Sequence, residues 1–426
     1  MKKWKRLLLT GIAACTTMVM SASAASFEQA ADALKAMGLF AGTSTGYELD
    51  RAPTRAEAAT MLVRLLGKTA EAEALWASGS ASFVFRDMDD FDWAQPYVHW
   101  LSRSGLAAGT SADRFSPSAP CTAQMYAAFL LRALGYSETA GDFTFDNAIS
   151  FARSHGVINS ANYDPSVFLR DHVVAASYTA LAAAPKGGED DLLTKLVRDG
   201  AVSQSAASAA LQEFSDYRGY ARVMQAVPDG IAMQNVTSFS ASGGLTLDIA
   251  AVSEAKMRGN AMSSKSSLTI TLPGENPFVQ ERNSYFADGR WYTNVDGAKT
   301  WRALGSMPAV RPEAVPLVLI DEIRAENAEY ILAYNAAGRA YYQAQLWQLL
   351  QTGAPALRDL TITGLNSEVR VKDGALAALS TGITASATLE NSTVNIRAQQ
   401  SSSISETGNG VSVTVPEGLS TYTQAT

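Results

Sequence analysis

The feature that most constrains this chain is a short segment that recurs at the end of a helix. It spans residues 36–42 (AMGLFAG) and 103–109 (RSGLAAG), and it returns more weakly at 154–159 (SHGVIN). Each copy follows an amphipathic stretch and precedes a loop and a second helical stretch. The glycine lies where a helix end needs a left-handed residue. The sequence therefore predicts three helix–loop–helix repeats.

The spacing also predicts where the helices lie. The helices before the three glycines are expected at residues 27–37, 96–104 and 147–155, and those after them at 55–66, 123–134 and 172–182. The first gap between the repeat glycines is longer than the second. Residues 69–82 fill it and are expected to form an extra helical connector.

The N-terminus has the features of a secretory signal peptide. Lys2, Lys3 and Arg6 precede an apolar run at residues 7–20, and Ala22-Ser23-Ala24 is a cleavage site of the A-x-A type. We expect residues 1–24 to be removed from a secreted surface protein. An alternative is a lipobox at Ile12-Ala13-Ala14-Cys15 that would lipidate Cys15. The apolar run continues beyond Cys15 to Met20, which favours conventional cleavage.

The composition excludes several classes of partner and site. The chain of 426 residues has 34 basic and 41 acidic side chains, so it has no overall attraction for nucleic acid. Its only cysteines are Cys15 and Cys121, and cleavage would leave Cys121 alone. The mature chain then has no disulfide and no cysteine-rich zinc site, and Cys121 is interpreted as a small apolar filler. No metal and no cofactor is predicted.

Beyond the repeats, the sequence changes from helix-forming to strand-forming segments. Residues 185–216 are expected to form a linker with short helices at 192–197 and 205–214. From residue 217 onward, β-prone runs flank dipeptides that favour tight hairpins. These dipeptides are Asp288-Gly289, Asp296-Gly297, Asp373-Gly374 and Asn409-Gly410.

The predicted architecture is therefore multidomain. An all-α three-repeat bundle at residues 25–184 is followed by an α+β domain at 217–426 with a mostly antiparallel sheet. Helices are expected to interrupt this sheet at residues 316–327 and 340–351. A strand is expected at Val411–Val415, where valines alternate with small polar residues.

The repeats resemble the S-layer homology family over residues 26–184. Repeat one contains PTRAEAA at residues 53–59, close to the TRAE helix of that family. Repeat two contains, in family order, FRD at 85–87, WAQPYV at 93–98, FSP at 115–117 and LLRALG at 130–135. Repeat three is weaker, with YDP at 163–165 and FLRDH at 168–172.

This resemblance implies a compact bundle that binds secondary cell-wall polymer in grooves between repeats. That glycan is often pyruvylated, and an arginine fork can hold its carboxylate bidentately. Arg55 is the first candidate, followed by Arg64 and Arg132. Asp87 and Trp93 are further candidates for contacts with sugar.

Each candidate also has a purely structural interpretation. Thr54 and Glu57 have the spacing of a capping box, and Asp87 is expected to cap the next segment. Arg55 lies outside the capping box. It is interpreted either as a ligand for the glycan or as a solvated arginine in the first turn of its helix. Trp93 recurs with Tyr97 and Trp100 at helical spacing, which favours a buried stripe.

Repeats two and three depart from the family pattern. Ala123 stands where the family arginine is expected, so this groove is predicted to bind weakly. Repeat three has Arg170 in the corresponding region. Whether Arg170 replaces the missing arginine stays open at this point.

One segment of the C-terminal domain resembles LolA-like and LppX-like lipoprotein-carrier folds. It runs from Asn283 to Trp301 and joins two aromatic strands through a DG turn. The resemblance implies a curved antiparallel sheet that wraps helices and can hold an acyl chain. Tyr285, Trp291, Tyr292 and Trp301 would line such a cavity, although ordinary core packing is the competing interpretation.

The sequence does not favour an enzyme. His99, His155 and His172 all lie in the repeats, so the C-terminal domain alone offers no histidine for a catalytic or metal site. We therefore expect a wall-anchored surface protein whose C-terminal domain binds a ligand or surface-protein partner. The alternatives are a wall-acting hydrolase that uses only carboxylates, and a lipid-binding surface protein.

Overall fold

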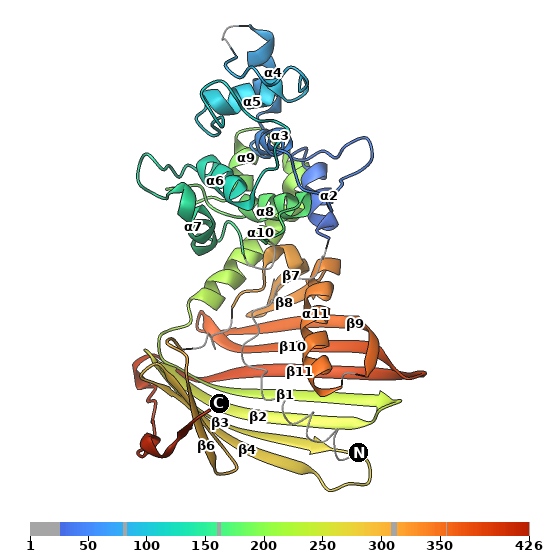
Figure 1. The fold of residues 1–426 in the computed structure, drawn as a ribbon, viewed down its shortest axis with the longest axis vertical. Coiled ribbons are helices and arrows are strands. Elements are labelled where there is room, and N and C mark those ends of the chain that lie inside the picture. Colours follow the sequence, from blue (N-terminus) through green and yellow to red (C-terminus); the bar gives the residue numbers. More distant parts are fainter. Residues whose placement is uncertain (1–25, 80–82, 160–162, 308–312, 355, 426) are drawn as a thin grey trace.

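The protein is described from a computed structural model that covers residues 26–79, 83–159, 163–307, 313–354 and 356–425. The predicted signal peptide and Cys15 lie outside these residues. Figure 1 shows a helical region next to a wide, curled sheet, with helix α10 between them. This is the predicted order of an all-α region followed by an α+β domain, and the predicted fold class is confirmed.

Three helix–loop–helix units form the helical region. In chain order the pairs are α2 (Glu28–Ala36) with α3 (Arg55–Leu65), α5 (Gln95–Arg103) with α6 (Ala123–Ala133), and α7 (Ala148–Ser154) with α8 (Arg170–Leu181). The repeat glycines end the first helix of each pair at positive φ, with 75° at Gly38, 70° at Gly105 and 71° at Gly156. The glycine repeat thus marks the helix ends as predicted.

The three units close into a ring. The first helix of each unit packs on the second helix of another unit: α5 on α3, α7 on α6, and α2 on α8. The last of these contacts joins the first unit to the third. One continuous hydrophobic core fills the ring, with Leu62, Leu101, Leu131 and Val174 among its fully buried members.

An additional helix follows the first unit. The predicted connector is α4 (Thr69–Ala77), and it lies against α5. Its carboxylates accept hydrogen bonds from aromatic side chains of α5: Trp100 Nε1 donates to Glu71 over 2.9 Å, and the Tyr97 hydroxyl donates to Glu73 over 2.8 Å. These bonds fasten α4 to the middle unit.

The helical and sheet regions share one long helix. After α9 (Leu192–Arg198), α10 (Gln204–Gln225) continues well beyond Phe214, where the sequence had predicted its end. Phe214 belongs to the core of the helical region, whereas Tyr220 and Met224 pack with the sheet. No loop therefore separates the two regions at this point. No helix among the described residues is both long and apolar enough to cross a membrane.

Within the described residues, twelve strands form one sheet in the order β12-β6-β5-β4-β3-β2-β1-β11-β10-β9-β8-β7. All neighbours are antiparallel except β12 and β6. The strands are β1 (Ile231–Gly243), β2 (Leu247–Arg258), β3 (Ala261–Thr271), β4 (Phe278–Ala287), β5 (Arg290–Val295), β6 (Ala298–Ala303), β7 (Ile320–Glu326), β8 (Glu329–Tyr334), β9 (Leu357–Lys372), β10 (Ala375–Leu389), β11 (Ser392–Thr407) and β12 (Thr423–Gln424).

Three of the four predicted hairpin dipeptides form turns between paired strands. Both residues of each have positive φ, for example 53° at Asp373 and 77° at Gly374, as a two-residue turn of type I′ requires. Asn409-Gly410 is instead part of a short 3-10 turn, η4 (Gly408–Gly410). The predicted strand at Val411–Val415 was wrong, because this segment pairs with none of the strands that the structure describes.

One face of the sheet carries helix α11 (Ala336–Gly353), which lies across β9, β10 and β11 in Figure 1. Leu346 and Leu350 of α11 pack on Ile249, Ile270 and Ile396 of the sheet. The prediction of a helix at residues 340–351 is confirmed. The helix predicted at 316–327 was wrong, since this segment is a 3-10 turn, η3 (Leu317–Leu319), followed by β7.

Candidate functional site

The units meet where the second helix of one unit enters the loop of another. Arg55, the first residue of α3, is 4% exposed and points into the loop of the middle unit. Its Nε donates to Phe115 O over 2.8 Å and its Nη2 donates to Ala108 O over 3.1 Å, with the guanidinium 4.7 Å from the centre of the Phe115 ring. Burial lowers the pKa of Arg55 from its ordinary value.

Arg170 repeats this arrangement at another junction. It is the first residue of α8, is 2% exposed, and its Nε donates to Tyr47 O over 3.0 Å in the loop of the first unit. The backbone follows the same pattern, because Arg170 N–H donates to Arg51 O as Arg55 N–H donates to Ala119 O. Arg170 therefore lies at the position in the third unit that Arg55 occupies in the first.

The remaining junction differs at the first position of the entering helix, which is alanine and not arginine. Ala123 is the first residue of α6, and its carbonyl accepts a hydrogen bond from the buried Tyr163 hydroxyl of the third unit's loop. Thr122 caps α6 by accepting from Met125 N–H over 3.2 Å. At this junction the Tyr163 hydroxyl bonds the start of α6, and Tyr163 O accepts from Arg153 Nη2 of the same unit over 3.4 Å.

The loops of the first two units share a backbone conformation. Thr43 bridges to Gly46 in the first loop, and Ser111 bridges to Arg114 in the second. The non-glycine residues Glu48 and Ser116 have φ of 50° and 58° at equivalent places. Such left-handed residues are uncommon, so their recurrence supports a common origin for the two loops.

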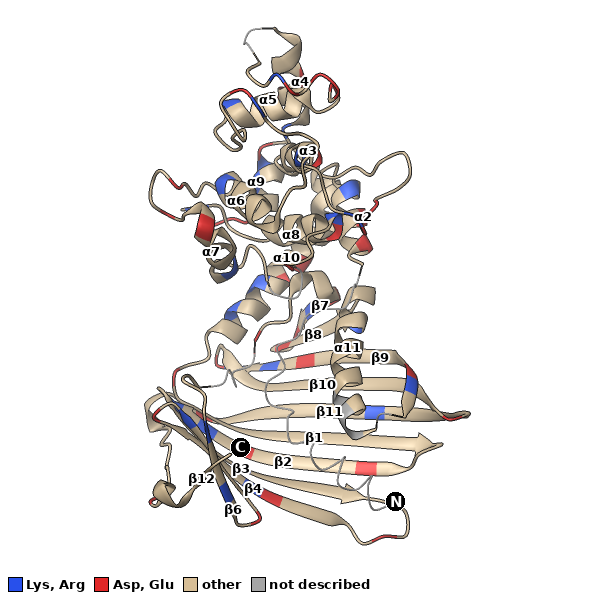
Figure 2. Ribbon diagram, in the orientation of Figure 1, with Lys and Arg blue, Asp and Glu red and all other residues tan. Residues whose placement is uncertain are grey.

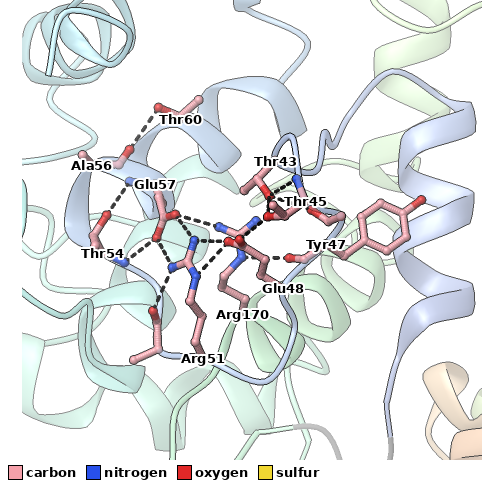
Figure 3. A network of polar contacts seen from close by, with 12 residues as sticks. Thr43, Thr45, Tyr47, Glu48, Arg51, Thr54, Ala56, Glu57, Thr60 and Arg170 are labelled. Atoms are coloured by element: carbon pink, nitrogen blue, oxygen red, sulfur yellow. Dashed lines mark hydrogen bonds and ion pairs between the residues drawn. The ribbon is translucent and has the colours of Figure 1, made fainter.

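A charged network surrounds the junction of the first and third units (Figure 3). Arg51 forms ion pairs with both Glu48 and Glu57, and Arg170 lies 3.2 Å from Glu57. Glu57 also accepts the Thr54 N–H over 2.8 Å, so the predicted capping box is confirmed. Burial opposes ionisation of Glu57, but bonds from Arg51 and Thr54 outweigh it and lower its pKa.

Arg51 and Glu48 of this network were not predicted from the sequence. Arg51 is the more accessible of the two arginines in this network, because its side chain is 39% exposed and that of Arg170 is 2% exposed. The sequence did contain a signal for the place of Arg51 in the network, since Arg51 lies three residues before the capping threonine. It was not decisive because an exposed loop arginine is common.

The middle unit has an open groove of about 540 Å³. Its floor is the backbone around Gly105 to Gly109, where a Cβ on Gly109 would approach Arg114 O to 2.4 Å. Arg132 lines the groove and holds Glu138 with its Nε over 3.0 Å, while its Nη1 donates to Leu106 O over 3.2 Å. This groove combines an accessible cation, a carboxylate and exposed backbone.

The other predicted binding residues lie apart from this ion pair. Asp87 accepts the N–H groups of Phe115 and Ser116, each over 2.9 Å, so it fixes the loop. Burial raises the pKa of Asp87, but these two bonds outweigh it and the pKa is lowered. Arg64 lies over the ring of Tyr97, 5.9 Å from its centre.

Trp93 differs from its predicted environment. It is 50% exposed, whereas Tyr97 and Trp100 are each 8% exposed. The expectation of a buried stripe holds for the latter two and was wrong for Trp93. The ring of Trp93 is 6.4 Å from that of Phe91, and both lie just before α5.

The four aromatic residues predicted to line a C-terminal cavity do not share one face. Tyr285 pairs with Tyr292, and Tyr292 with Trp301, which puts these three on one face of β4, β5 and β6. Trp291 points to the opposite face and packs against the cluster that contains Phe286 and Met257. The prediction of a single cavity was therefore wrong, because neighbours along a strand point to opposite sides.

Residues 84–122 match the S-layer homology domain family. The match covers the first helix and the loop of the middle unit, together with Thr122, the cap of α6. It includes the carbonyls of Phe115 and Ala108 that bind Arg55.

Three proteins with curated names are similar to parts of the chain. The "Middle cell wall protein" of Brevibacillus brevis is 29% identical over 137 residues, which is 32% of this chain and 13% of that protein. The "Cell surface protein" of Thermoanaerobacter kivui is 26% identical over 156 residues, or 36% and 20% of the two chains. An "Endoglucanase" of a Bacillus species is 32% identical over 75 residues, or 18% and 8%.

This chain therefore spans at most 20% of the length of these three relatives. The similarity concerns a shared module. The S-layer homology domain is a cell-wall anchoring module, and the family match to this chain is to that module. Two of the three relatives carry cell-wall or cell-surface names, which agrees with an anchoring module.

Proposed function

We propose that this chain is a secreted surface protein that attaches non-covalently to secondary cell-wall polymer through three degenerate S-layer homology repeats. The family match to residues 84–122 carries the proposal. The first and third units are assigned to the same family because their junctions repeat the geometry of the matched one. Arg170 and Arg55 make equivalent main-chain and side-chain bonds.

The groove of the middle unit is the proposed glycan site. Arg132 and Glu138 form its accessible ion pair, with side chains 20% and 32% exposed. An acidic substituent of the polymer can replace Glu138 on the Arg132 fork, because a guanidinium binds any carboxylate in the same bidentate geometry. The backbone around Gly109 lines the same groove beside this ion pair.

The buried arginines have a different part in this proposal. Arg55 and Arg170 use their Nε donors on backbone carbonyls and so hold the grooves in shape. Trp93 is exposed and suited to stack on a sugar ring. Arg64 and Asp87 support the walls of the middle unit. Affinity at one groove is expected to be modest, and many copies on a wall would add avidity.

Sedimentation of the full mature chain with purified cell wall tests the proposal. The wild-type chain is expected to pellet with intact wall and to stay in solution when the wall polymer has been extracted. Arg132→Ala is expected to lower the bound fraction at least fivefold. Arg198→Ala is the matched control, because Arg198 is an exposed arginine with a carboxylate partner outside the groove. Equal pelleting of both variants would refute the site.

The two alternative functions make separate predictions. A hydrolase delivered by the repeats would clear peptidoglycan or wall glycan in a zymogram, and the similarity to the endoglucanase covers only 75 residues. A lipid-binding protein would release acyl species in native mass spectrometry. The anchoring proposal requires neither result.

A further inference from the structure

The face of the sheet opposite α11 contains a polar hollow of about 230 Å³. It lies over β11, β1, β2 and β3, which are neighbours in the sheet. Pairing arranges its side chains in two rows. One row is Arg397, Ser240, Asp248 and Thr271, and the other is Gln399, Ser238, Ala250 and Thr269.

The pattern of side-chain size explains the hollow. Ser238, Ser240 and Ala250 are small and occupy the middle of the grid, whereas Arg397 and Gln399 rise from β11 at its border. Polar residues are ordinary on a sheet face in water. The hollow is large enough for several waters, since one water takes about 30 Å³ in the liquid.

The two charged residues of the hollow have opposite signs and do not pair with each other. Arg397 and Asp248 both lie opposite Ser240, from either side, so their strands are about 10 Å apart. Both side chains are exposed, and within the described residues neither forms a hydrogen bond or an ion pair. The surrounding sheet is sparsely charged, as Figure 2 illustrates, and β1 has no charged residue at all.

We propose that this hollow binds one sugar unit of a glycan. Hydroxyl groups of a sugar both donate and accept hydrogen bonds, as do the serine, threonine and glutamine side chains that line the site. Arg397 supplies donors for an acidic or carbonyl oxygen at one end, and Asp248 accepts from hydroxyl or amino groups at the other. The volume is suited to a single ring.

This site is separate from the groove that holds Arg132 and goes beyond the proposed anchoring. No aromatic side chain lies among these eight positions, because Phe239 alternates with Ser238 and Ser240 and packs on the face that carries α11. Binding to a free sugar is therefore expected to be weak. A chain already attached to the wall would keep the hollow at a high effective concentration of glycan. The two sites together would then bind more tightly than either alone.

Saturation-transfer NMR on the full mature chain tests this inference with glucose, glucosamine and glucuronic acid. At least one sugar is expected to receive saturation. Ser240→Leu fills the hollow and is expected to reduce that signal at least fivefold. Ser403→Leu is the matched control, because Ser403 is exposed on the same face of β11 but outside the hollow. Absence of signal from all three sugars would overturn the proposal, as would equal signals from the two variants.

Further variants separate this site from the anchoring groove and identify the charge in use. Arg132→Ala is expected to keep the sugar signal while it weakens wall binding, and loss of the signal in this variant would move the sugar to the helical region. Asp248→Asn is expected to remove a preference for glucosamine. Arg397→Gln is expected to remove a preference for glucuronic acid. Retention of that preference by the corresponding variant would contradict the assigned orientation.

Discussion

Arg55 and Arg170 occupy equivalent positions at two junctions of the ring, and the Nε of each donates to a carbonyl of an aromatic residue in another unit. The acceptors are Phe115 O at 2.8 Å and Tyr47 O at 3.0 Å. Both guanidinium groups are buried, so each supplies a donor to a loop carbonyl and adds to the backbone bonds that cross the same junction. This relationship makes the two arginines determinants of stability.

Arg55→Ala is therefore expected to destabilise the protein. The substitution leaves Phe115 O and Ala108 O without their donor, and a buried unpaired acceptor costs on the order of 1–3 kcal/mol. We expect a loss of about 3 kcal/mol in the free energy of unfolding, measured by urea denaturation. Arg198→Ala, an exposed control, is expected to change it by less than about 0.5 kcal/mol. Similar values for the two variants would contradict the role of the junction.

Stability is expected to fall as the pH rises from 5.5 to 8. Burial raises the pKa of Glu213 and of Asp171 to about 7, and Asp321 adds to the effect on Glu213. Because these folded-state values exceed the unfolded ones, the folded chain binds more protons, and its stabilisation is lost as pH passes through about 7. The carboxyls of Glu57 and Asp87, whose pKa values are lowered, act only in more acidic solution.

Thermal unfolding at several pH values measures this dependence. Glu213→Gln keeps the size of the side chain and its bond with Tyr178, which is 2.8 Å long in the native protein, but cannot ionise. The melting temperature of this variant is expected to depend less on pH between 5.5 and 8 than that of the wild type. An unchanged slope would show that Glu213 is ionised in the folded state throughout this range.

Trp93→Ala is expected to separate binding from folding. The side chain is 50% exposed, so its removal is expected to shift the melting temperature by no more than about 1 °C. If Trp93 stacks on sugar, the fraction of protein that sediments with wall falls several-fold. Trp100→Ala serves as the contrast, because Trp100 is buried and bonded to Glu71 and its loss is expected to lower stability strongly.

Gly374→Ala tests the turn between β9 and β10. Gly374 has a φ of 77°, and a Cβ there would meet no atom within 4 Å. The cost is therefore conformational and is expected to be about 1–2 kcal/mol in the free energy of unfolding. Ser380→Ala, in the same hairpin, is expected to be nearly neutral. A neutral result for Gly374→Ala would mean that the turn relaxes to another type.

Much of the helical region follows from local sequence. The glycines at 38, 105 and 156 predicted the ends of three helices, and the Thr54–Glu57 spacing predicted a cap. The residues that meet at each junction could not be predicted in this way. Arg55 lies 60 residues from Phe115, and Arg170 lies 123 from Tyr47, so their contacts depend on how the ring closes.

The errors in the sheet domain have local causes. A helix was predicted at residues 316–327, yet β7 in this segment pairs with its neighbour β8 in an antiparallel hairpin. The opposite orientation of Trp291 and Tyr292, in contrast, was available from alternation alone. The polar hollow could not be predicted from the sequence, because it forms only where β11 lies beside β1. The paired residues of these two strands are more than 150 positions apart.

Helix α10 belongs to two hydrophobic cores along its length, through Phe214 at one and Tyr220 and Met224 at the other. A force on the sheet domain of an attached molecule would therefore pass along this continuous helix to the helical region. No flexible linker would extend first at this point. Mechanical load on the sheet would reach the α8 and α9 side of the ring directly, so detachment from the surface and rupture of the protein become competing events.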